Sequence, residues 1–236
     1  MTPIVLVHGG AHGAWCWAPL VPLLRVPTIA VDLPPESMRN GPDRFTVPPG
    51  TDALTLADWA QAVVNAADRA GMSRFVLVGH SLGGLTLTEV ARTAPGRVAH
   101  LVFVSAVVPA EGRNVVDTLP PQMIARMGSG LTEDLVREMF CNDMDEAQTN
   151  FVLDNVGGEV PQIMVEPVTR AGLPSTLPKT YVRLARDQGL PPAAQDASIA
   201  ALGTGVDVVA LDTGHNVMIS RPDLLAPVLN GIAKSS

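Results

Sequence analysis

Ser81 lies at the centre of a GxSxG pattern, between Gly79 and Gly83. An apolar run, RFVLV, comes before the pattern, and a stretch of helical character, LTLTEVARTA, comes after it. A strand, a sharp turn and a helix in this order raise a serine hydroxyl out of the backbone, where a base can take its proton. A side chain at either glycine would collide with such a turn. Ser81 is therefore predicted to be a nucleophile.

Two later loops offer the partners that a serine nucleophile needs. Asp187 follows the apolar run TYVRLAR, and His215 follows the run VDVVALD, so that the chain order is Ser, Asp, His. If these runs are parallel strands, all three residues meet at one edge of the sheet. His215 is predicted to accept the serine proton, and Asp187 to hold the correct imidazole tautomer.

Other aspartates are less well placed to be the acid. Asp212 lies only three residues before His215 and would have to fold back on its own loop. Asp207 begins the same strand, at the opposite edge of the sheet, and Asp32 precedes the nucleophile and is typical of a turn before two prolines. The run HLVFVSAVV, after which the acid is also commonly found, offers Ser105 and no carboxylate.

A tetrahedral intermediate needs two amide donors for its oxyanion. The backbone N–H of Leu82, at the start of the helix after the nucleophile, is predicted to be one of them. The second is expected from the glycine-rich loop HGGAHG at 8–13, in which Gly10 is the predicted donor. His12 is expected to line or support this loop.

Length and hydrophobic pattern predict the fold that positions these residues. The chain has 236 residues, 47% of them apolar, which suits a single α/β domain over 1–236. Alternating strand and helix patterns predict a doubly wound, mostly parallel sheet of about six strands. The strands, all expected to be buried, are predicted at 4–8, 28–34, 74–81, 100–108, 180–186 and 206–212. The intervening pieces are a tryptophan-containing segment at 14–24 and helices at about 52–70, from 82, and after 222.

One connection, between the predicted strands ending near Val108 and starting near Thr180, spans about 70 residues and is too long for a simple crossover. Its short helical pieces, rich in Met and Phe, predict an inserted helical cap over about 109–178 with an apolar pocket beneath it. Each Met could equally fill a gap in the core. The predicted substrate-binding residues are His12, Met123, Met127, Phe140 and Met164.

Charge and cysteine content argue against several other classes of protein. Only 17% of residues are charged, the net charge is −7, and no basic cluster invites nucleic acid or an anionic membrane. The first residues, MTPIVLVHGG, include no cationic stretch, and no apolar run approaches the roughly 18 residues that span a bilayer, so neither secretion nor membrane insertion is expected. Cys16 and Cys141 follow no metal or redox spacing, so two reduced thiols and a cytoplasmic location are expected.

The remaining motifs give no sign of a cofactor. The histidines lack metal-ligand spacing with a nearby carboxylate, so no catalytic metal is expected. The glycine-rich segments lack a Walker lysine and a GxGxxG pattern, so no nucleotide is expected. We predict a small-molecule substrate, no membrane and no nucleic acid, and the sequence leaves a homodimer open.

The whole length resembles the α/β-hydrolase superfamily, within it the branch of plant methyl-ester hydrolases of the salicylate-binding type and hydroxynitrile lyases. The resemblance is carried by VLVHGGAHGAWCW at 5–17, by VGHSLGG at 78–84, and by RDQGLP with TGHNVMISRPDLL. It implies an α/β-hydrolase fold with an inserted helical cap. By this resemblance, the triad positions are Ser81, Asp187 and His215, and the oxyanion amides are those of Gly10 and Leu82.

Two departures from the resembling lyases favour hydrolysis. Those lyases carry a Lys after the triad histidine and a Thr after the first histidine of the HG loop, where this chain has Asn216 and Gly9. An ammonium for a leaving cyanide is therefore missing. The expected function is a serine hydrolase that cleaves a carboxylic ester or lactone of a small, largely apolar molecule through an acyl-enzyme. A biosynthetic enzyme for cyclisation, elimination or C–C cleavage, or a small-molecule binding protein, remains the alternative.

Overall fold

A computed structural model describes residues 1–35, 51–128, 131–158 and 160–236, with the side chains of residues 52 and 126–128 outside the description. Within these residues, six strands form one all-parallel sheet in the order β2-β1-β3-β4-β5-β6. The strands are β1 (Ile4–Val7), β2 (Thr28–Val31), β3 (Phe75–His80), β4 (Val98–Val104), β5 (Lys179–Leu184) and β6 (Val206–Leu211). The six predicted strands and the doubly wound parallel sheet are confirmed.

Two strands differ from their predictions. β4 ends at Val104 rather than at 108, because Ser105 adopts a φ of +40° and turns the chain out of the sheet. β6 lies at the edge of the sheet, and Asp207, Val208 and Ala210 are exposed. The expectation of a buried strand is therefore wrong for β6, which pairs with β5 alone, and in β2, at the other edge of the sheet, only Val31 is buried.

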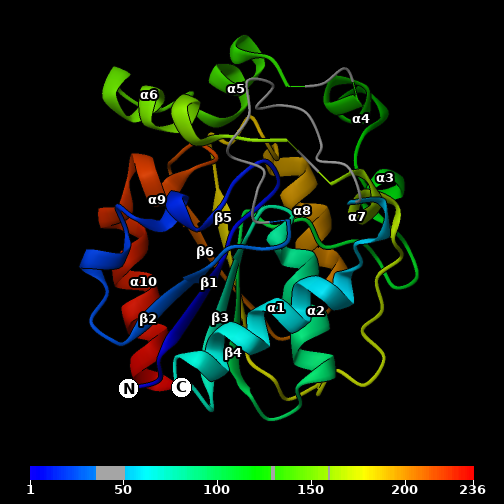
Figure 1. The fold of residues 1–236 in the computed structure, drawn as a ribbon, viewed down its shortest axis with the longest axis vertical. Coiled ribbons are helices and arrows are strands. Elements are labelled where there is room, and N and C mark those ends of the chain that lie inside the picture. The colour runs from blue at the N-terminus through cyan, green and yellow to red at the C-terminus, as the bar shows by residue number, and fades with distance from the viewer. Residues whose placement is uncertain (36–50, 129–130, 159) are drawn as a thin grey trace.

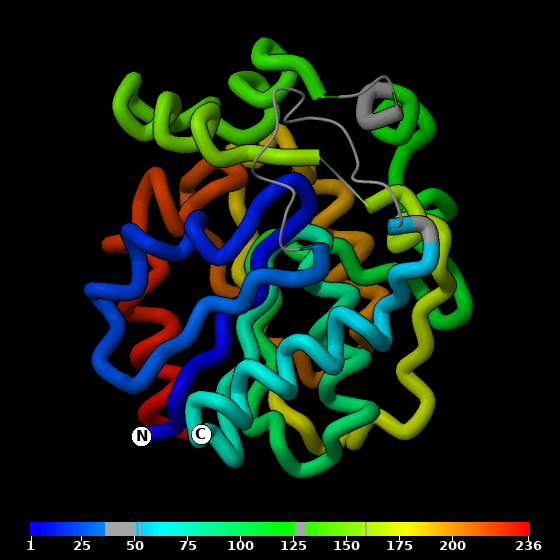
Figure 2. Tube along the Cα trace, in the orientation of Figure 1, coloured from blue at the N-terminus to red at the C-terminus, as the bar shows by residue number. Residues whose placement is uncertain are grey.

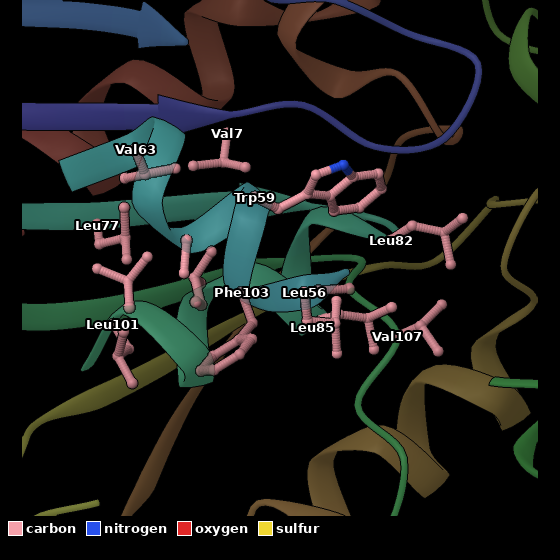
Figure 3. Packing of buried hydrophobic residues seen from close by; sticks show 14 of the residues in the cluster. Val7, Leu56, Trp59, Val63, Leu77, Leu82, Leu85, Leu101, Phe103 and Val107 are labelled. Atoms are coloured by element: carbon pink, nitrogen blue, oxygen red, sulfur yellow. The ribbon is translucent and has the colours of Figure 1, made fainter. Parts of the chain in front are cut away.

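Alternate residues of each central strand pack on opposite faces of the sheet. On one face, Val7, Leu77 and Phe103 pack with α1 (Leu56–Arg69) and α2 (Gly83–Thr93), as Figure 3 shows. On the other, Leu6, Val78 and Val104 pack with the 3-10 helix η1 (Ala14–Trp17), α9 (Val217–Ser220) and α10 (Pro222–Ser235). Two shorter 3-10 helices are η2 (Val21–Leu23) and η3 (Thr51–Ala53).

Among the described residues, five helices connect β4 to β5 within residues 109–178, and we call this stretch the 109–178 segment. They are α3 (Val115–Thr118), α4 (Pro121–Gly128), α5 (Glu133–Phe140), α6 (Glu146–Asn155) and α7 (Pro161–Val165). Figures 1 and 2 show α4, α5 and α6 above the edge at which the strands end. The 109–178 segment is therefore placed over the loops that carry the predicted site.

A further helix, α8 (Pro192–Ala201), lies between β5 and β6 and was not anticipated from the sequence. The sequence feature that indicates this helix is Pro192 at its first position. A proline is well tolerated there because the first N–H groups of a helix have no partner within the helix. The side chain of Gln195 on this helix bonds both backbone groups of Leu184 and the carbonyl of Leu190. These bonds fix the loop that leaves β5.

Candidate active site

Ser81 occupies a strained turn between β3 and α2. Its φ is +51°, a value that a residue with a side chain rarely adopts. Backbone hydrogen bonds hold the turn from both sides: the Ser81 N–H donates to the carbonyl of Val104 at 3.2 Å, and its carbonyl accepts from the N–H groups of Gly84 and Val107. The strain is therefore supported by the neighbouring strand β4 and the loop after it.

Close backbone contact explains the glycine after the serine. A Cβ atom at Gly83 would lie 2.6 Å from the carbonyl oxygen of His8, at the end of β1. The start of α2 thus packs directly on the loop that follows β1. This contact brings Ser81 and the glycine-rich loop 8–13 to the same place.

The structure brings Asp187 and His215 together, both almost fully buried. His215 Nδ1 donates to Asp187 Oδ2 at 2.7 Å. Two further donors reach the same carboxylate: the backbone N–H of Leu190 at 2.7 Å and the hydroxyl of Ser105 at 2.5 Å. Three hydrogen bonds hold this buried carboxylate in one orientation, which is what an oriented imidazole requires.

Ser105 is a residue of the site to which the sequence assigned no role. It lies one residue beyond β4, where its N–H donates to the carbonyl of Val182 in the adjacent strand β5. One feature of the sequence could have indicated this role. Ser105 follows the predicted strand that lies next to the strand leading to Asp187, at the same carboxyl edge of the sheet. Ser105 adopts a positive φ, which the sequence does not reveal, and its hydroxyl contacts the acid from there.

The imidazole of His215 is enclosed by three groups. Phe140 of α5 stacks on it at 5.3 Å between ring centroids, and Gly189 packs so closely that a Cβ there would lie 2.8 Å from the ring. His80, whose ring centroid is 4.5 Å away, donates from Nε2 to the carbonyl of His215 at 3.0 Å. Burial lowers the pKa of His80 well below its usual value, so this histidine is a neutral support for the loop.

His12 supports the glycine-rich loop from behind. Its Nδ1 donates to the carbonyl of Gly10 at 2.7 Å, and its ring stacks on Trp15 at 5.2 Å. Burial lowers its pKa to about 3, although the bond to Gly10 opposes the shift. His12 is not among the described residues that line the cavity next to Ser81, and its role as a substrate contact stays a prediction.

A cavity of about 460 Å³ lies between Ser81 and the 109–178 segment. Ser81 and His215 both line it, as do three of the predicted substrate-binding residues, Met123, Phe140 and Met164. The side chain of Met127 lies outside the described residues.

Among the described lining residues, Ser81 and His215 contribute the only polar side chains. Val116 of α3 and Val165 of α7 line the cavity and are also exposed, so it opens to solvent beside these two helices.

Gly10 and Leu82 line the same cavity. Within the described part of the chain, the backbone N–H of neither residue donates to a protein acceptor. Two backbone donors are thus left for a ligand beside Ser81, one at the start of α2 and one in the loop after β1. Two such donors are what an oxyanion site needs, and the assignment of Gly10 and Leu82 to that role stays a prediction.

The three aspartates that the sequence makes less suitable as the acid are exposed or bonded to other groups. Asp212 is exposed and pairs with Arg186 at 3.1 Å on the surface. Asp207 is exposed on β6, and Asp32 accepts from the backbone N–H of Ala14 at 2.7 Å. The described residues contain no group of three His, Cys, Asp or Glu side chains that could hold a metal ion.

The parallel sheet, the strained serine between β3 and α2, and the later acid and histidine loops define the α/β hydrolase class. The chain belongs to the alpha/beta hydrolase family, whose pattern it matches over residues 4–228. The fold class expected from the sequence is thus confirmed. Among the described residues, no helix has the length and apolar character needed to cross a membrane.

Three known proteins illustrate the similarity. A probable esterase of rice, PIR7A, is 37% identical over 120 residues, which are 49% of this chain and 43% of the rice protein. The chain is also 28% identical over 243 residues to the carbendazim hydrolyzing esterase of Nocardioides sp. (strain SG-4G), across 97% of this chain and 98% of that one. The match to the rice protein thus spans less than half of that relative's length, whereas the match to the second relative spans nearly all of it.

The third protein is a solved structure, the extracellular alpha/beta-hydrolase of a Paenibacillus species, described as sharing structural and functional homology with tobacco salicylic acid binding protein 2. It superposes with a TM-score of 0.80 at 22% identity, covering 98% of this chain and 99% of that one. The match to the rice protein confirms the expected resemblance to plant esterases, and the solved structure shows the shared fold.

Proposed function

We propose that this protein is a serine hydrolase that cleaves a carboxylic ester or lactone of a small, largely apolar molecule through an acyl-enzyme. The observation that carries the proposal is the convergence of Ser81 with the buried His215–Asp187 pair at one apolar cavity. Two relatives that are named esterases support the same class of reaction.

Each residue has one task in the proposed reaction. Ser81 attacks the ester carbonyl while His215 takes its proton, and Asp187 stabilises the imidazolium that results. His215 then gives the proton to the alkoxide that leaves, which completes the acyl-enzyme and releases an alcohol. Water attacks the acyl carbon with His215 again as base, and the carboxylic acid departs as Ser81 regains its proton.

The backbone N–H groups of Gly10 and Leu82 are proposed to bind the oxyanion of both tetrahedral intermediates. The start of α2 adds its dipole to this site. The bond from His12 to the Gly10 carbonyl fixes the peptide plane next to the donor. Removing one such donor typically costs about 100- to 1,000-fold in kcat.

The cavity favours an uncharged substrate. Its lining is apolar apart from Ser81 and His215, so within the described residues no side chain can pair with a carboxylate or an ammonium on the substrate. Burying an unpaired charge there costs far more than burying an apolar group of equal size. We propose that the 109–178 segment acts as a cap whose Met and Phe side chains select the acyl or ring portion.

The test compares 4-nitrophenyl valerate with 4-nitrophenyl hemisuccinate, two esters of similar length of which only the second is charged. The wild-type protein should hydrolyse the neutral ester with a kcat/KM at least about 100-fold higher, since a difference of about 2.7 kcal/mol is enough for that ratio. Ser81→Ala should abolish turnover of both esters. Equal rates on the two esters would contradict the substrate class, and tight binding of the neutral ester without turnover would favour a binding protein.

A further inference from the structure

The turn between α5 and α6 reaches both loops that carry the buried Asp187–His215 pair. Asn142 donates from its side-chain amide to the carbonyl of Arg186 at 2.8 Å. Asp143 accepts from the backbone N–H of Gly214 at 2.6 Å through Oδ2. Arg186 and Gly214 immediately precede Asp187 and His215, so two neighbouring residues of the 109–178 segment each hold the peptide next to one member of the pair.

The turn between α5 and α6 also packs closely against the loop that carries His215. A Cβ at Gly214 would lie 2.5 Å from Oδ1 of both Asn142 and Asp143, so the histidine loop lies directly against the turn. Asp143 Oδ2 also accepts from the hydroxyl of Ser220 at 3.0 Å, at the end of α9. This bond links α9, the short helix that follows His215, to the carboxylate of Asp143.

The two loops are joined to each other beneath the turn. The N–H of Arg186 donates to the carbonyl of Thr213 at 2.9 Å, which continues the pairing of β5 and β6 beyond the strands. Asn142 and Asp143, in the turn between α5 and α6, each hydrogen-bond to one of these two loops. Neither residue is among the described residues that line the cavity, so they can act on a reaction there only through the loops that they hold.

We propose that Asn142 and Asp143 are positioning residues that set the alignment of His215 with Asp187, a role that rests on the proposed function of that pair. Proton transfer between Ser81 and His215 depends on sub-ångström geometry, and a displacement of about 1 Å can cost about 100-fold in rate. A carboxylate that accepts a backbone N–H makes a strong, short hydrogen bond, which suits Asp143 to this task. Because substrate contacts are untouched, the role affects kcat and leaves KM alone.

The experiment uses Asp143→Ala, Asp143→Asn and Asn142→Ala, with Asp145→Ala as the matched control. Asp145 lies in the same turn and caps α6 through Gln148, but its side chain makes no described bond to either loop. For each variant kcat and KM on a neutral aryl ester, the melting temperature, and the low-field proton resonance of the His215–Asp187 hydrogen bond are measured. His215→Gln assigns that resonance by its loss.

Asp143→Ala should lower kcat by about 10- to 100-fold with KM within about twofold, and should shift or broaden the low-field resonance. Asp143→Asn should keep kcat within about threefold, because its amide oxygen can accept the same two bonds. Asn142→Ala, which alters an exposed side chain, should lower kcat by a smaller factor. Asp145→Ala should lower the melting temperature alone.

An unchanged kcat and resonance in both alanine variants at the turn would overturn the positioning role, as would an Asp143→Asn variant as impaired as Asp143→Ala. If Asp143→Ala does not fold, Asn142→Ala decides by the same two measurements. Failure of the proposed function is recognised separately, because Ser81→Ala would then retain ester turnover. The low-field resonance reports the alignment of the pair whether or not the ester is hydrolysed.

Discussion

The hydroxyl of Ser105 donates to the carboxylate of Asp187 at 2.5 Å, on the same oxygen that accepts from His215. Ser105 follows β4 and Asp187 follows β5, and the two strands are neighbours in the sheet. The acid is therefore held by a residue from the adjacent strand as well as by its own loop. This second attachment fixes which way the carboxylate faces.

Ser105→Ala should lower the free energy of unfolding by about 1.5–3 kcal/mol, the usual contribution of a hydrogen bond to a charged group. It should also lower kcat/KM several-fold, because Asp187 would hold the imidazole less firmly. Ser198→Ala is the matched control, since Ser198 is equally buried and accepts from the N–H of Val108 instead. Denaturant unfolding and ester kinetics on both variants measure the two effects, and an equal loss of activity in the control would contradict the role of Ser105.

Asp187→Asn should lower kcat about 10⁴-fold, because an amide at this position favours the wrong tautomer of His215. Asp212→Asn, three residues before the histidine, should change kcat by less than about twofold, because that side chain is exposed and only pairs with Arg186 on the surface. Steady-state kinetics of the two asparagine variants make the comparison. A larger loss in Asp212→Asn would show that the assignment of the acid is wrong.

Gly189→Ala should lower kcat at least about tenfold, since the new methyl group would lie 2.8–3.0 Å from ring atoms of His215 and must displace the ring. Gly231→Ala is a suitable control, because the position in α10 has open space for a methyl group. The control should be neutral or stabilising by up to about 1 kcal/mol. Wild-type kcat in Gly189→Ala would mean that the imidazole is not held where the structure places it.

The buried histidine His12 should make stability depend on pH. Because burial lowers its pKa from 6.5 to about 3, the unfolded chain binds a proton there below pH 6.5 that the folded chain does not bind until about pH 3. Its contribution to stability is thus complete above pH 6.5 and is lost as the pH falls through this window, at up to about 1.4 kcal/mol per pH unit.

His12→Gln removes this titration. The difference in unfolding free energy between pH 7 and pH 5 should be about 2 kcal/mol smaller in the variant than in the wild type. The absolute stability of the variant also changes through the lost bond to Gly10, so the pH dependence is the measurement that decides. Parallel pH dependences would contradict the lowered pKa of His12.

The arrangement of the sheet and the meeting of three distant residues could be predicted because they follow from local pattern. Strands that end just before Ser81, Asp187 and His215 place all three at one edge of any parallel sheet. The supports of these residues could not be predicted in this way. Ser105 contacts Asp187 from a backbone with a positive φ, which no local sequence pattern predicts here. His80 reaches the carbonyl of His215 across 135 positions of the chain, a contact that no local spacing encodes.

In the 109–178 segment too, the sequence predicts the general character but not the individual contacts. Its length and composition predicted an apolar insertion, and Met123, Phe140 and Met164 do line the cavity. Leu135 and Ile163 have the same apolar character in the sequence but are not among the described residues that line the cavity, so composition alone does not identify the lining residues. Asn142 and Asp143 are polar residues in a turn, a setting in which most side chains contact solvent, and only the fold shows what they hold.

In the proposed reaction, Ser81 carries the acyl group during turnover. The most direct measurement is rapid-quench mass spectrometry of the intact protein during hydrolysis of 4-nitrophenyl valerate, followed by peptide mapping of the adduct. We expect a burst of nitrophenol of about one equivalent per site, a mass increase equal to one acyl group on Ser81, and loss of both in Ser81→Ala. Sustained turnover by Ser81→Ala, or an acyl group on another residue, would contradict the proposed reaction.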